Sequence, residues 1–133
     1  MESSKVAFWT ITDLSFADAV ERCRESLAAE GFGVLTEIDV QATLKKKLDV
    51  DRDPYLILGA CHPPSADRAL RAVPGVGVLL PCNLTVSVED GRTVVRAIDP
   101  ASAMGILEEP ELEDVGTQVG AALRRVIESL ESA

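Results

Sequence analysis

The chain has 133 residues, of which 47% are hydrophobic and only 4% aromatic, so aliphatic side chains must form its core. A chain of this length is typical of one domain, here residues 1–133, and at this size folding requires neither a disulfide nor a bound metal or cofactor. The net charge of −9 argues against binding to nucleic acids and to anionic membranes, because both require a basic surface.

The start of the sequence and its cysteine content indicate a cytoplasmic protein. Residues 1–11, MESSKVAFWTI, lack the basic start and the long apolar run of a secretory signal. No apolar run approaches the roughly 20 residues that span a bilayer. The chain has three cysteines, an odd number that suits reduced thiols better than a disulfide framework.

The first element in chain order is a strand over residues 5–11, predicted from its β-branched and aromatic side chains. Asp13 or Ser15 can cap the helix that follows, and Gly31 ends that helix. Cys23 lies on the apolar stripe of the helix, so we interpret it as a buried core residue.

The middle of the chain predicts two more strands, each followed by a short helix. Residues 33–38 have the pattern of a strand, and residues 40–48 that of an amphipathic helix with three lysines on its outer side. After a polar turn, residues 55–60 form an unbroken apolar strand. Two prolines then start a helix over residues 63–72, since proline fits the first turn of a helix.

A further strand and a hairpin are predicted next. Residues 76–80 are expected to be a fourth strand, and from Cys82 onwards apolar and polar residues alternate as in a strand with one wet face. Asp90-Gly91 is a strong hairpin signal, and residues 93–98 form the partner strand.

The C-terminal third predicts a short helix that starts at Pro100 and a long helix that starts at Pro110. Gly116 and Gly120 lie four residues apart in the long helix, which allows a close approach either to the sheet or to a second subunit. The sequence therefore predicts an α+β fold with a mostly antiparallel sheet, helices packed on one side and a long C-terminal helix.

The candidate site is the segment of residues 57–83, ILGACHPPSADRALRAVPGVGVLLPCN, which holds the only histidine and two of the three cysteines. If the helix over residues 63–72 runs back along the sheet, the strands on either side of it are parallel, and Cys61 and Cys82 emerge at the same end. We therefore expect a small ligand pocket built on Cys61, Cys82, Asn83 and His62.

Three interpretations of this pocket stay open. Cys61, Cys82 and His62 are suited to bind zinc or copper, although a closed zinc site needs four ligands. Alternatively, Cys61 is a nucleophile, Cys82 its resolving thiol and His62 a base, which would make the protein a thiol-dependent redox enzyme or sensor. In the third interpretation both thiols are structural and pack at strand ends.

Four stretches of the sequence resemble the family called domain of unknown function 302. They are GFGVLTEIDVQATLKKKL, YLILGACHPPSADRAL, VGVLLPCNLTV and VVRAIDP. The resemblance implies a fold of the TATA-binding-protein-like class with a β-α-β(4)-α arrangement, and homodimers in a bacterial or archaeal cytoplasm. It implies no reaction, because none is assigned to the family.

The chain departs from the family pattern at two positions. His62 stands where the family commonly has asparagine between the cysteine and the proline, and Asp67 stands where it often has a histidine. Cys61, Cys82 and Asn83 match the family, so a site would be built on these residues first and on His62 second. The function stays open between a ligand- or metal-binding domain, a thiol-dependent redox protein, and a structural or interaction module that acts as a homodimer.

Overall fold

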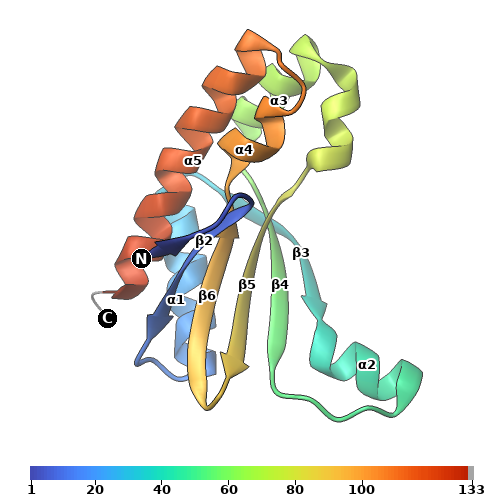
Figure 1. The fold of residues 1–133 in the computed structure, drawn as a ribbon, viewed down its shortest axis with the longest axis vertical. Coiled ribbons are helices and arrows are strands. Elements are labelled where there is room, and N and C mark those ends of the chain that lie inside the picture. The colour runs from blue at the N-terminus through green and yellow to red at the C-terminus, as the bar shows by residue number, and fades with distance from the viewer. Residues whose placement is uncertain (132–133) are drawn as a thin grey trace.

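A computed structural model describes residues 1–131 as one antiparallel sheet with helices along one face and at one end (Figure 1). In chain order the elements are β1 (Glu2–Ser3), β2 (Ala7–Thr12), α1 (Phe16–Ala29), β3 (Gly33–Asp39), α2 (Val40–Leu48), β4 (Tyr55–Cys61), α3 (Pro63–Ala72), the 3₁₀ helix η1 (Pro74–Leu79), β5 (Cys82–Glu89), β6 (Arg92–Ile98), α4 (Pro100–Gly105) and α5 (Pro110–Glu131).

The sheet has six strands in the order β1-β2-β6-β5-β4-β3, and every neighbouring pair is antiparallel. The long helix α5 and helix α1 lie along one face of it (Figure 1). The α+β fold with a long C-terminal helix is therefore confirmed.

The core lies between this covered face and the two helices. Cross-strand neighbours such as Leu58 and Leu84, or Val86 and Val95, point to the same face because paired residues share a side of the sheet. All four are at most 1% exposed. The inner side of α5 completes the core with aliphatic residues at helical spacing: Leu112, Val115, Val119, Leu123, Val126, Ile127 and Leu130.

The opposite face of the sheet, the open face, carries a polar cluster in place of a helix. The Glu89 carboxylate accepts hydrogen bonds from Arg96 and from the Ser87 hydroxyl, the latter over 2.6 Å. These two contacts, Arg96 first, lower the pKa of Glu89 to about 2. The guanidinium of Arg96 also lies 5.7 Å from the centre of the Trp9 ring, so the cluster holds one end of the open face together.

Most local signals are confirmed. The Ser15 hydroxyl caps α1 by accepting from the Asp18 N–H, and Cys23 is fully buried. Asp90 and Gly91 form the β5–β6 turn with φ values of 52° and 76°, the left-handed conformation that a tight hairpin requires.

The predicted strand over residues 76–80 is wrong. Residues 76–79 belong to η1 and Leu80 follows it, and the turns of η1 close through short-range bonds such as Val76 N–H to Val73 C=O. Val76 is fully buried whereas Val78 is 89% exposed, so the apolar run does not enter the sheet. The chain reaches the sheet again only at Cys82, and β4 and β5 are antiparallel rather than parallel.

Gly116 and Gly120 lie within the chain's own packing, against the start of α4. A Cβ on Gly116 would lie 2.9 Å from both Ala101 Cα and the Pro100 carbonyl oxygen, whereas one on Gly120 would be 3.7 Å from the Pro100 ring. The glycines therefore permit a close approach, as expected, but to α4 rather than to the sheet or to a second subunit.

Candidate functional site

One end of the sheet carries α3, η1 and α4, and we call it the helical end (Figure 1). The strands β4 and β6 end there, and β2 and β5 begin there, because neighbouring strands are antiparallel. Cys61 and Cys82 therefore lie at the same end, as predicted, but through an antiparallel pair of strands rather than a parallel one.

The two thiols occupy different environments. Cys82 pairs with Ala60, and successive residues of a strand point to opposite faces, so Cys82 lies on the covered face and Cys61 on the open face. Cys82 is 6% exposed, and burial, followed by the nearby Cys61, raises the pKa of its thiol to about 11. A thiol with this pKa is protonated at neutral pH and is a poor nucleophile or metal ligand. Cys61 is half-buried.

Asn83 lies outside any enclosed space. It is exposed and pairs across the strands with Gly59. The open face at Gly59 is covered by Thr36 and Pro81, since a Cβ on that glycine would lie only 2.1 Å from Thr36 Oγ1 and 2.8 Å from Pro81 Cγ. The amide of Asn83 is thus available to solvent rather than to a pocket shared with Cys82.

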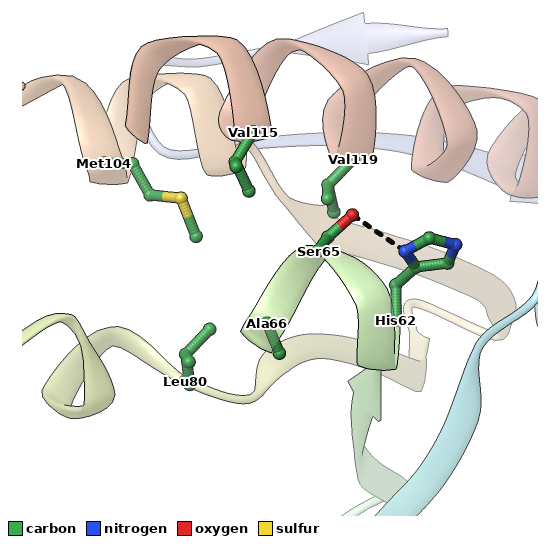
Figure 2. A pocket seen from close by; sticks show the side chains of 7 residues that line it. All are labelled: His62, Ser65, Ala66, Leu80, Met104, Val115 and Val119. Carbon is green, nitrogen blue, oxygen red and sulfur yellow. Dashed lines mark hydrogen bonds between the residues drawn. The ribbon is translucent and has the colours of Figure 1, made fainter. Parts of the chain in front are cut away.

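His62 is held by three neighbours. It precedes α3, and its Nδ1 lies 2.7 Å from the Ser65 hydroxyl (Figure 2). Its ring centre lies 5.4 Å from that of Phe32. Gly31, with φ of 85°, comes so close that a Cβ there would lie 3.3 Å from His62 Nε2. Within residues 1–131, no three histidine, cysteine, aspartate or glutamate side chains are grouped to hold a metal ion.

Two small cavities adjoin His62. The one in Figure 2 has a volume of about 20 Å³ between α3 and α5, and aliphatic side chains such as Val115 and Val119 line most of it. A volume of this size is enough for about one water molecule. The second has about 150 Å³ and is polar, with Glu30, Gln118 and Arg125 on its wall. In it Arg125 donates two hydrogen bonds to Glu30 Oε1, so the two charges largely neutralise each other.

A larger cavity at the helical end is an apolar groove of about 540 Å³. We call it the α4 groove, and it is lined by Lys5, Val6, Leu79, Ile98, Ser102, Ala103 and Ile106. Its walls come from the two residues before β2, the end of η1, the end of β6, and α4 with the residue that follows it. Val6 and Ile106 are 69% and 78% exposed, which is unusual for apolar residues that share one concave surface.

The α4 groove was missed at the level of sequence. Four separate segments supply its lining, and each contributes at most three residues that carry no motif. The one sequence signal is that Val6 and Ile106 are large apolar residues beside element boundaries, which does not distinguish a groove from ordinary surface.

Comparisons with known proteins agree on the relationship of this chain. Residues 9–130 match the family model described as "Domain of unknown function DUF302". A crystal structure of an uncharacterized conserved DUF302 protein from Bacillus stearothermophilus matches with a TM-score of 0.88 and 30% sequence identity. That match covers 94% of this chain and 98% of the other. Among curated proteins, none matches the sequence.

Within residues 1–131, no helix combines the length and the apolar character needed to cross a membrane.

Proposed function

The chain belongs to the DUF302 family, which has no assigned function, and we propose that it is a binding domain whose α4 groove holds a small, mainly apolar molecule. The observation that carries this proposal is the groove itself. Its volume of about 540 Å³ lies in the range of small-molecule sites, and five of its seven lining residues are apolar.

The expected affinity follows from the area that a ligand can cover. Removing about 200 Å² of apolar surface from water contributes about 5 kcal/mol before the cost of association. Since about 5 kcal/mol corresponds to a dissociation constant of about 0.2 mM and the cost of association must be subtracted, a simple eight-carbon probe should bind no more tightly than about 0.2 mM, in the millimolar range. A ligand that fills more of the groove should bind more tightly.

The test uses 1-octanol as the probe and compares two matched variants. Ile106→Ser removes one wall of the groove, and Val78→Ser removes an apolar residue that is 89% exposed and does not line it. Isothermal titration should give at least fivefold weaker binding for Ile106→Ser and unchanged binding for Val78→Ser. Absence of binding to the wild-type protein, or equal loss in both variants, would contradict the proposal.

A second role, assembly as a homodimer, is favoured by β3. This strand is at the edge of the sheet, and its outer side faces no strand within residues 1–131. Leu35 and Ile38 are 66% and 48% exposed, and the adjoining helix α2 has no buried residue and projects from the rest of the fold (Figure 1). Long apolar edge strands are normally protected. A second copy that pairs along β3 would protect this one.

Light scattering coupled to gel filtration tests the dimer. We expect a mass twice the 14.2 kDa of one chain, and we expect Leu35→Glu to reduce it to that of a monomer. Val78→Glu is the matched control, because it adds the same charge at an exposed apolar residue far from β3 in the chain. A monomeric wild-type protein would refute the assembly, and a dimer that survives Leu35→Glu would refute this surface.

The cytoplasmic location and the thiol and metal hypotheses stay predictions. Zinc or copper binding by Cys61, Cys82 and His62 is checked by metal analysis of protein purified without chelators. A redox role requires that the double variant Cys61→Ser, Cys82→Ser lose its function in cells, and normal function of that variant would exclude it.

A further inference from the structure

We propose that the ligand of the α4 groove is an amphiphile with a single anionic head group, which Lys5 binds at the rim while the apolar body lies in the groove. This inference rests on the proposed function, since it names the chemical class of molecule that the groove takes. The groove has one charged residue in its lining, and that residue is a cation.

Lys5 is available for such a head group. It is exposed, and among residues 1–131 it forms no ion pair, whereas Lys45 is paired with two aspartates and Arg68 with Glu111 and Asp114. Lys5 directly precedes Val6, which lines the same groove. A head group at Lys5 can therefore stay in contact with water while the attached chain covers Val6.

The acidic residue closest in sequence to the groove has hydrogen-bond and ion-pair partners of its own. Asp99 follows Ile98, but its carboxylate accepts from the Ala101 N–H over 3.1 Å and from the Ser102 hydroxyl over 3.3 Å. Its other contact is Arg124, 4.0 Å away on α5. The carboxylate thus caps α4, and the groove contains no acidic side chain that would repel an anion or attract a cation.

The net charge of −9 does not overturn this preference. At physiological ionic strength charges are screened beyond about 8 Å, so the adjacent ammonium group dominates over acidic residues elsewhere on the surface. The same net charge disfavours an anionic membrane as the source of the head group, because a membrane meets a whole face of the protein rather than one lysine. The ligand is therefore a dissolved molecule.

The experiment compares three probes with the same eight-carbon chain: octanoate, 1-octanol and octylammonium. Wild-type protein should bind octanoate about tenfold more tightly than octylammonium. Lys5→Glu should reverse that order. Lys46→Glu is the control, because Lys46 is also exposed and unpaired within residues 1–131 and its replacement changes the net charge equally. It should leave the order of the probes intact.

The outcomes separate this inference from the proposed function. If 1-octanol binds but the charge of the probe has no effect, or if Lys46→Glu reverses the order as well, the head-group assignment is wrong and the groove remains a binding site. If none of the three probes binds wild-type protein, the proposed function itself fails. Circular dichroism should show that both variants are folded, since neither lysine has a buried partner. Lys5→Gln repeats the test with a neutral side chain, and it should bind octanoate and octylammonium with equal affinity.

Discussion

Replacing Gly116 by alanine should destabilise the protein, whereas the same change at Gly120 should stabilise it. Both glycines lie in α5, where alanine is favoured over glycine by about 1 kcal/mol. At Gly120 the new methyl group would meet its nearest neighbour at 3.7 Å, an ordinary contact. We therefore expect Gly120→Ala to raise the free energy of unfolding by about 0.5–1 kcal/mol.

At Gly116 the methyl group would lie 2.9 Å from two backbone atoms of α4, which cannot rotate away as a side chain would. Overpacking of this kind costs about 1–3 kcal/mol, which equals or exceeds the gain in helix propensity. The free energies of unfolding of the two variants should thus differ by about 1–3 kcal/mol. The gain in helix propensity is the same in both variants and cancels in this difference. Because α4 also supplies Ser102 and Ala103 to the α4 groove, only Gly116→Ala should weaken binding of 1-octanol.

Urea unfolding followed by circular dichroism measures this difference directly, and the dissociation constant for 1-octanol is measured on the same two samples. Equal stability of the two variants, or a Gly116→Ala protein more stable than wild type, would refute the close packing of α4 on α5. A destabilised Gly116→Ala protein with unchanged binding would refute the link between that packing and the groove.

Three further predictions follow from the environments of single side chains. With a thiol reagent at pH 7–8, Cys61 should react in the native protein, whereas Cys82, whose pKa is raised to about 11, should react only on unfolding; fast reaction of two thiols would contradict its burial. Glu89 has a folded pKa of about 2, below its unfolded value of about 4.3, so its pairing with Arg96 stabilises the fold above pH 4–5 and is lost towards pH 2. The melting temperature of Glu89→Gln should accordingly fall below that of wild type at pH 7 and match it near pH 2; a difference independent of pH would disprove this. Gly31→Ala should lower the free energy of unfolding by about 1–2 kcal/mol, because φ is 85° there and the methyl group would also press on the imidazole of His62. A urea midpoint at or above that of wild type would exclude this strain.

The parts of the fold that the sequence predicted are those with local causes. The Asp90-Gly91 turn needs two residues with positive φ, and the helices that start at Pro63 and Pro110 begin where proline loses nothing by lacking an N–H. The strand prediction for residues 76–80 failed because an apolar run is equally compatible with a strand and with a 3₁₀ helix that buries only Val76. The choice between the two depends on whether another strand pairs with the run, which the sequence of the run does not specify.

The candidate site was predicted in part, for reasons of the same kind. Cys61 and Cys82 lie at one end of the sheet, but the register of β4 against β5 places them on opposite faces, and a register depends on pairing that a single strand does not encode. The α4 groove depends on contacts between segments far apart in the chain, from Val6 to Ile106, and arises only when α4 packs on α5.

An amide chemical-shift titration of the protein with octanoate tests the binding role of the α4 groove most directly. We expect saturable shifts for residues that line the α4 groove, led by Lys5, Val6, Ala103 and Ile106, and no shifts around Cys61 and His62. Shifts centred on Cys61 and His62 would move the site to the polar cavity beside α3. Absence of saturable shifts anywhere would contradict a binding role for the groove.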